Sequence, residues 1–278
     1  MSPGDASWGA LYRFLPYCGA PPDPTSLLHR WNLDPVLLTG LAVIVVAYTA
    51  SGRSQIASWR RACFYGGWLI GTAALVSPLC PLSVSLFSAR VAQHMLLAAV
   101  VAPLVALGRP GEVLADGIAR LTGRLAPRAA PHHRPILAAA AFAIALWVWH
   151  APTPYTATFE TDAAYWAMHL TVFGTALWLW SALLDDVGER LGPFVVASLL
   201  TTVQMGLLGA IITFAGRPLY PPHQLTTFAW GLSPLEDQQL GGVVMWVPAG
   251  AILVVSLAAA FTQAMRRAET RALSHSLA

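Results

Sequence analysis

Residues 89–108 read ARVAQHMLLAAVVAPLVALG, a mostly apolar run that contains the polar side chains of Arg90, Gln93 and His94. An α-helix needs about 20 apolar residues to cross the roughly 30 Å hydrocarbon core of a bilayer. An ionisable side chain inside such a span is costly, and it usually faces the interior of a helix bundle. The stretch therefore predicts a transmembrane helix with polar groups near one end.

Similar runs recur along the 278-residue chain, which is 56% hydrophobic and only 10% charged. A soluble domain has roughly a quarter charged residues, so lipid is the expected surrounding. We predict an all-α, polytopic membrane bundle of about seven transmembrane helices. The expected spans are 33–51, 62–79, 89–108, 135–151, 163–184, 193–215 and 239–264. They form one domain (33–264), preceded by residues 1–32, which do not resemble a signal peptide, and followed by a tail (265–278).

Arginine positions predict the orientation, because short Arg-rich loops stay in the cytoplasm. All 16 basic residues are arginines, and twelve fall on one side of the predicted spans. These twelve are Arg53, Arg60, Arg61, Arg109, Arg120, Arg124, Arg128, Arg134, Arg190, Arg266, Arg267 and Arg271. The other four are Arg13, Arg30, Arg90 and Arg217. We expect the N-terminus outside and the C-terminus inside a bacterial inner (cytoplasmic) membrane, with a cytoplasmic loop at 109–134 and outer loops at 80–88, 152–162 and 216–238.

Histidines indicate where chemistry is expected. His94 lies about five residues into the third span, His150 ends the fourth, and His169 lies about six residues into the fifth. At 1.5 Å per residue all three share one layer near the outer surface. Imidazole, thioether and carboxylate groups together favour copper, and Cu(I) prefers the softer sulfur. We predict a metal site whose candidate ligands are His94, His150, His169, Asp237, Met95, Met168 and Met245.

Each candidate also has an ordinary structural interpretation. A single interfacial histidine is more often a hydrogen-bonded structural residue, and methionines in an apolar chain more often pack. In the alternative interpretation Asp237 caps the N-terminus of the seventh helix, where the helix dipole stabilises a negative charge. The shared depth of three histidines on successive helices is what favours a metal.

Small residues, prolines and cysteines indicate packing more than chemistry. Close helix approach is expected at glycines of the second and seventh spans, namely Gly66, Gly67, Gly71, Gly241 and Gly242. Two prolines, Pro103 and Pro248, lie inside predicted spans. Each should kink its helix and free a carbonyl that needs a partner within the bundle. The three cysteines have no metal-binding spacing, and we expect no disulfide among Cys18, Cys63 and Cys80.

A series of short strings runs through residues 77–246 in an order that matches the predicted spans. They are Ser77-Pro78-Leu79, Phe87-Ser88-Ala89, Gln93-His94-Met95-Leu96-Leu97, Ala102-Pro103-Leu104, Leu107-Gly108-Arg109-Pro110, Trp149-His150-Ala151-Pro152, His169, Leu208-Gly209-Ala210-Ile211, Pro218-Leu219-Tyr220 and Asp237-Gln238-Gln239-Leu240-Gly241-Gly242-Val243-Val244-Met245-Trp246. Together they resemble the multi-span CtaG family of cytochrome c oxidase assembly factors. The resemblance implies a seven-helix bundle that is needed to assemble a haem-copper oxidase and takes part in delivering copper to it.

The chain departs from the family pattern at two positions. The resemblance leads us to expect His-x-x-x-His in the third span, where this chain has Arg90 in the first position. Tyr165, four residues before His169, likewise stands where relatives carry His. Arg90 would repel a nearby cation. It has three alternative roles: pairing with Asp237 or Glu236, binding an anionic lipid, or binding a partner.

The sequence leaves other functions open. Paired histidines on facing helices also hold haem, so a haem-binding membrane protein is the alternative to copper. A scaffold without a metal is a further one. We expect no enzyme, because no nucleophile-base set, phosphate loop or carboxylate pair is evident. The expected partners are the bilayer, an oxidase subunit and a periplasmic copper donor. Scattered arginines indicate no nucleic acid, and the oligomeric state is not predicted.

Overall fold

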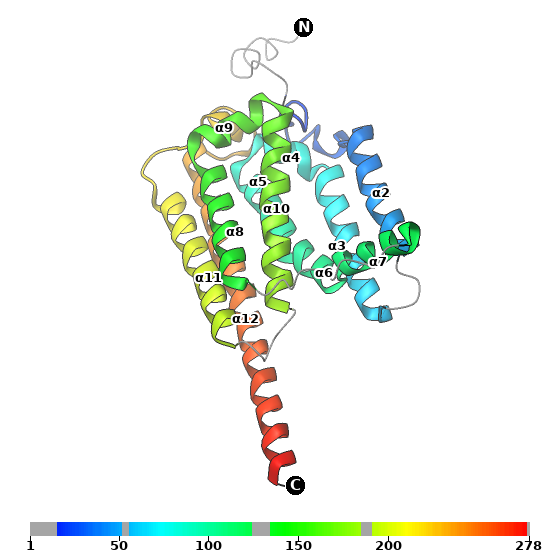
Figure 1. Cartoon of the computed structure of the whole chain (residues 1–278). Coiled ribbons are helices and arrows are strands. Elements are labelled where there is room, and N and C mark those ends of the chain that lie inside the picture. Colours follow the sequence, from blue (N-terminus) through cyan, green and yellow to red (C-terminus); the bar gives the residue numbers. More distant parts are fainter. Residues whose placement is uncertain (1–15, 52–55, 124–133, 185–190, 277–278) are drawn as a thin grey trace.

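The computed structural model describes residues 16–51, 56–123, 134–184 and 191–276, and every regular element within these ranges is a helix. Figure 1 shows long helices running roughly side by side, with the C-terminal half of α12 extending beyond the others. The predicted all-α bundle is confirmed. Five of the arginines that indicated the orientation lie outside the described residues. These are Arg13, Arg53, Arg124, Arg128 and Arg190.

Most predicted spans correspond to observed helices. Those that agree to within two residues at each end are α2 (Pro35–Ser51), α8 (Pro135–His150), α10 (Asp162–Leu184) and α11 (Leu191–Phe214). Helix α3 (Ser58–Val76) begins and ends earlier than predicted. Helix α12 (Pro234–Ser276) extends well beyond the predicted seventh span at both ends.

Two of the predicted outer loops contain short helices, which the sequence did not reveal. Helix α4 (Leu79–Ser85) occupies most of 80–88 and meets α3 at a bend of 48°. Helix α9 (Pro152–Glu160) occupies 152–162 and meets α8 at 73°. Both helices are shorter than a span, so a search for long apolar runs misses them. In the third predicted outer loop the short turns η3 (Pro221–His223) and η4 (Thr227–Trp230) follow α11.

The third span is continuous but not uniformly α-helical. Helix α5 (Phe87–Met95) passes through a π-helical segment, Leu96–Val101 (η2), into α6 (Ala102–Leu107). This π-helical segment lies just before Pro103, which has no backbone N–H to donate. The carbonyl of Ala98 instead accepts a hydrogen bond of 2.8 Å from the Trp180 indole of α10. The prediction that a freed carbonyl finds a partner within the bundle is therefore confirmed here, whereas the side chain of Pro248 is not described.

The predicted cytoplasmic loop 109–134 also contains a helix, α7 (Pro110–Thr122). Val113 and Gly117 are buried, while Leu121 on another side is exposed, so this helix is amphipathic. It packs against α2 (Figure 1).

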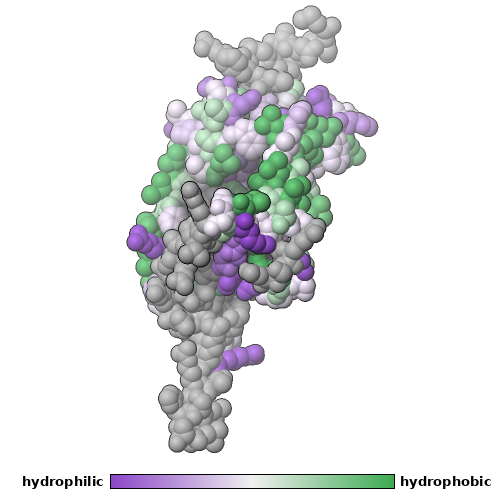
Figure 2. All heavy atoms as spheres, turned by 45° about the vertical axis from the view of Figure 1, so that its right-hand side comes forward, coloured by the Kyte–Doolittle hydropathy of each residue, from purple (hydrophilic) through white to green (hydrophobic). Residues whose placement is uncertain are grey.

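The composition of the helices makes this a membrane protein. Among the described residues, three helical stretches are long and apolar enough to cross a bilayer: Phe87–Leu107, Asp162–Leu184 and Gly192–Phe214. Counting the bent pairs α3–α4 and α8–α9 raises the number to five, and α2 is a shorter apolar helix. Figure 2 shows hydrophobic side chains spread over one face of the molecule. The count of seven spans and the placement of the termini remain predictions.

Close contacts at glycines join the helices. A Cβ added to Gly67 of α3 would lie 2.8 Å from Leu104 Cβ, and one added to Gly242 of α12 would lie 2.8 Å from the carbonyl oxygen of Gly209. Gly71 and Gly241 are also in close contact with neighbours, whereas Gly66 has none within 4 Å. The glycine prediction is confirmed except at Gly66.

Candidate functional site

Two of the predicted ligand histidines lie side by side. The rings of His94 on α5 and His169 on α10 have centroids 5.2 Å apart and an interplanar angle of 74°. Both side chains are buried, and neither Nε2 atom has a hydrogen-bond partner. Nδ1 of His169 lies 3.1 Å from the Tyr165 carbonyl oxygen. A carbonyl only accepts, so this Nδ1 carries the hydrogen and Nε2 of His169 keeps a lone pair for another group.

The third histidine, His150, ends α8 and is also buried. Its Nδ1 lies 2.8 Å from the carbonyl oxygen of Leu146, which leaves its Nε2 in the same acceptor state as that of His169. The backbone carbonyl of His150 accepts a hydrogen bond from the Tyr220 hydroxyl, at 3.0 Å. The last turn of α8 is therefore fixed against the loop that precedes α12.

A fourth buried histidine, His223 in η3, has a structural partner. Its Nε2 lies 2.6 Å from the Tyr155 hydroxyl of α9. Burial, with the positive charge of Arg90 acting in the same direction, lowers the pKa of His223 to about 3. This side chain is therefore neutral at physiological pH, and it binds the η3 turn to α9.

Asp237 stabilises a helix other than its own. Its carboxylate accepts the backbone N–H of Phe87 at 2.6 Å, the N–H of Ser88 at 3.1 Å and the Ser88 hydroxyl at 2.5 Å. These are free donors of the first turn of α5, so Asp237 on α12 caps α5. The interpretation that it caps the seventh helix is wrong. Ser233 and Glu236 form that cap, because each accepts the other's backbone N–H.

The three predicted methionine ligands are all buried. Met95 and Met245 belong to the large hydrophobic core that joins α5, α8, α10, α11 and α12. The sulfur of Met168 lies 3.8 Å from a guanidinium nitrogen of Arg90. Packing methionines make contacts of this kind, and the role of the three as ligands stays a prediction.

Arg90 is buried, with only 2% of its side chain exposed. Its guanidinium donates to the Thr158 hydroxyl at 2.6 Å and lies 4.3 Å from the ring centre of Phe159 and 5.1 Å from that of Tyr155. Aromatic faces and one hydroxyl therefore stabilise the charge. The proposed pairing with Asp237 or Glu236 is not found in the described part of the chain, where the recorded ion pair is Arg109–Glu112.

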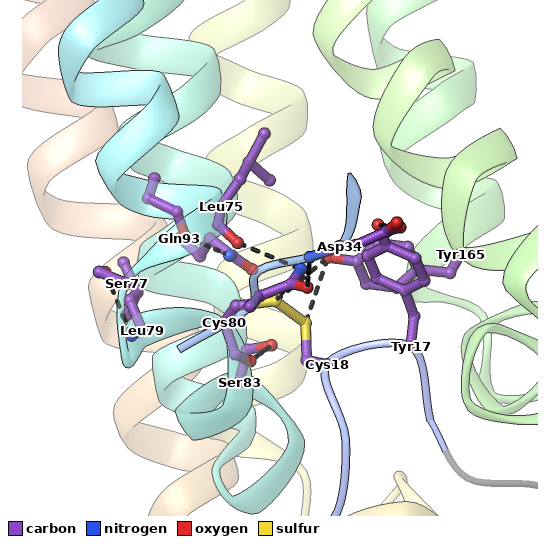
Figure 3. The surroundings of a disulfide bond; sticks show 12 residues. Tyr17, Cys18, Asp34, Leu75, Ser77, Leu79, Cys80, Ser83, Gln93 and Tyr165 are labelled. Carbon is purple, nitrogen blue, oxygen red and sulfur yellow. Dashed lines mark hydrogen bonds between the residues drawn. A yellow bond between two sulfur atoms is a disulfide. The ribbon is translucent and has the colours of Figure 1, made fainter. Parts of the chain in front are cut away.

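A disulfide joins Cys18, which precedes the first helix, to Cys80 of α4. The expectation that the cysteines form no disulfide is therefore wrong, and Cys63 is the one that stays free in the described chain. A signal was available, because Cys18 and Cys80 fall on the predicted outer side and Cys63 on the other. Figure 3 shows the rings of Tyr17 and Tyr165 side by side next to the two sulfur atoms. The Tyr17 hydroxyl donates to the Asp34 carboxylate, which lowers the pKa of Asp34.

The pair of histidines fits a metal only in part. Within the described residues, no three His, Cys, Asp or Glu side chains are grouped so that they could hold an ion. Two buried imidazoles with free Nε2 atoms are nevertheless suitable donors for copper, and especially for Cu(I), which accepts few ligands. An apolar cavity of about 420 Å³ between α2, α3 and α10 has His169 in its wall. The full predicted ligand set remains a prediction.

Comparison with known proteins supplies the family. Residues 40–267 match the family described as cytochrome c oxidase caa3 assembly factor (Caa3_CtaG). Uncharacterized proteins of Mycobacterium bovis and Mycobacterium tuberculosis are each 26% identical over 89% of this chain. The chain spans 41% of the length of these relatives. No solved structure matches. Since the family match covers most of the chain, the protein belongs to the caa3-type cytochrome c oxidase assembly factors.

Proposed function

We propose that the protein binds Cu(I) through His94 and His169 and passes it to a subunit of a haem-copper oxidase in the bacterial cytoplasmic membrane. The observation that carries the proposal is the pair of buried imidazoles with unpartnered Nε2 atoms and ring centroids 5.2 Å apart. A buried nitrogen without a partner is costly, and an ion between the two would satisfy both atoms.

The surroundings of the pair support transfer and not catalysis. A site with few protein ligands leaves coordination positions open to an incoming ligand, so an ion can pass by ligand exchange. The family description, an oxidase assembly factor, agrees with this role. In the orientation that the arginines predict, the pair lies toward the outer surface, the side on which a periplasmic copper donor and the receiving subunit would dock. Copper is the cargo of this process, and no chemical bond of a substrate is broken.

Haem is the alternative ligand. Axial ligation by both histidines requires a slot for a porphyrin between the rings, and their contact at 5.2 Å leaves none. The absorption spectrum of protein purified from haem-replete cells tests this directly. A Soret band at one haem per chain would replace the copper proposal with the haem one.

The proposal is tested by Cu(I) titration of the full-length, disulfide-bonded protein in detergent, with ascorbate present and a chromophoric Cu(I) chelator as competitor. We expect one tightly bound ion. His94→Ala and His169→Ala should each weaken binding at least tenfold, because each removes one of two donors. His29→Ala is the matched control, since His29 is exposed. Unchanged binding in the His94→Ala/His169→Ala double variant would exclude this pair.

A further inference from the structure

Two hydrogen-bond donors point at the sulfur atoms of the Cys18–Cys80 disulfide. The Tyr165 hydroxyl lies 3.4 Å from Cys18 Sγ and 3.8 Å from Cys80 Sγ. The side-chain amide of Asn32 lies 3.5 Å from Cys80 Sγ. Sulfur atoms in a disulfide carry no hydrogen, so the tyrosine and the asparagine are the donors in these contacts.

These donors are better suited to sulfur atoms in the reduced, thiolate state than to those of a disulfide. A disulfide sulfur is neutral and a weak acceptor, whereas a thiolate, free or bound to a metal, is charged and a strong one. Cys80 is fully buried, so its thiolate needs such donors to offset the loss of water. The positive charge of Arg90, whose guanidinium carbon lies 5.9 Å from the Tyr165 ring centre, acts in the same direction.

The same tyrosine connects the cysteines to the histidine pair. Tyr165 and His169 lie one turn apart on α10, and their ring centroids are 4.2 Å apart. His169 in turn contacts His94. The cysteines and the two imidazoles are therefore neighbouring sites in one part of the bundle.

We propose that Cys18 and Cys80, once reduced, form a second Cu(I) site whose two thiolates hold one ion beside the histidine pair. The inference rests on the proposed function, because it identifies the place from which His169 and His94 receive their ion. Two metal–sulfur bonds of about 2.3 Å separate the sulfurs by at most about 4.6 Å. The Cα atoms of Cys18 and Cys80 are 5.5 Å apart, which accommodates this separation.

The reduction needs an external protein dithiol. Its thiolate attacks the partly exposed Cys18 sulfur, and Cys80 leaves as a thiolate next to the Tyr165 and Asn32 donors. The second thiol of the reductant then breaks the mixed disulfide and releases Cys18. Two electrons and two protons pass to the cysteines, and the reductant becomes a disulfide. Binding of Cu(I) displaces the two thiol protons.

The test compares the oxidised and the reduced full-length protein in detergent. One sample is reduced with a dithiol, which is then removed without oxygen, and both samples are titrated with Cu(I) in ascorbate against the same competing chelator. We expect the reduced protein to bind one more ion than the oxidised one, with a thiolate-to-copper charge-transfer band in the near ultraviolet. Equal binding in the two states would show that the disulfide only holds the N-terminal segment in place.

Variants assign the extra ion. Cys18→Ser/Cys80→Ser should lose the extra ion. Cys63→Ser should keep it, because Cys63 takes no part in the Cys18–Cys80 pair. An extra ion that persists in the double serine variant overturns the proposal. If that variant does not fold, the thiols of the reduced wild-type protein are blocked by alkylation instead, and the alkylated protein should also lose the extra ion. The His94→Ala/His169→Ala variant should keep the thiolate ion, so failure of the histidine site and failure of the cysteine site are distinguished.

Discussion

Two parts of the molecule are held together by different forces. Where α4, α5, α9 and the start of α12 meet, buried polar groups bind one another, as in the cap that Asp237 forms on α5. Where α2, α3, α6 and α7 meet, apolar and small residues pack, for example Tyr48 stacked on Phe64 and Gly67 against Leu104. The histidine pair and the disulfide lie in or beside the first part.

The largest effect is expected from the polar part. Asp237→Ala removes an acceptor from two buried backbone N–H groups and a hydroxyl, so it should cost about 3–4 kcal/mol. For a chain of this length that corresponds to a fall in Tm of roughly 10 °C, measurable by thermal unfolding in detergent. Glu160→Gln changes an exposed carboxylate and serves as control. If Asp237→Ala leaves the Tm unchanged, buried polar contacts do not hold this part of the molecule together.

The apolar part should respond to a single methyl group. A Cβ at Gly67 would lie 2.8 Å from Leu104 Cβ and 3.2 Å from two backbone atoms of the third span. Gly67→Ala should therefore cost about 2 kcal/mol through overpacking. The neighbouring Gly66→Ala, with no atom within 4 Å, should be neutral or slightly stabilising in the same unfolding assay. If both variants behave alike, close packing does not hold this part together.

Arg90 should oppose the binding of a cation. It lies one turn before His94 on α5, and its charge is carried by aromatic faces with no carboxylate partner among the described residues. Arg90→Met removes the repulsion and should tighten Cu(I) binding roughly tenfold, in the chelator competition described above. Thr158→Val is the control, because it removes the partner of Arg90 and keeps the charge. Weaker binding in Arg90→Met would show that Arg90 supports the site.

At pH values just below 6.5, the smallest effect is a pH dependence of stability at His223. Its pKa is about 3 in the folded protein, well below the ordinary value of 6.5, so only the unfolded state takes up a proton between these values. Stability should therefore fall as pH decreases from about 6.5 towards 3, by about 1 kcal/mol for each pH unit. His223→Gln cannot titrate, and its Tm should depend less on pH than that of the wild type. Parallel curves for the two proteins would contradict this assignment.

Local sequence determined the all-helical membrane fold and most helix positions, because an apolar run of about 20 residues has few alternatives to a spanning helix. It also placed His94 and His169 at one depth. It did not show the short helices α4 and α9, whose lengths lie below that of a span.

Only the tertiary structure decided which side chains meet. Asp237 caps a helix 149 residues away, and Cys18 is joined to Cys80 across 62 residues. The same structure puts the rings of His94 and His169 in contact, and it holds His169 and His150 each by a hydrogen bond to a carbonyl of its own helix. Depth along a helix follows from residue number, but the direction in which a side chain points into the bundle depends on how the helices are rotated and packed.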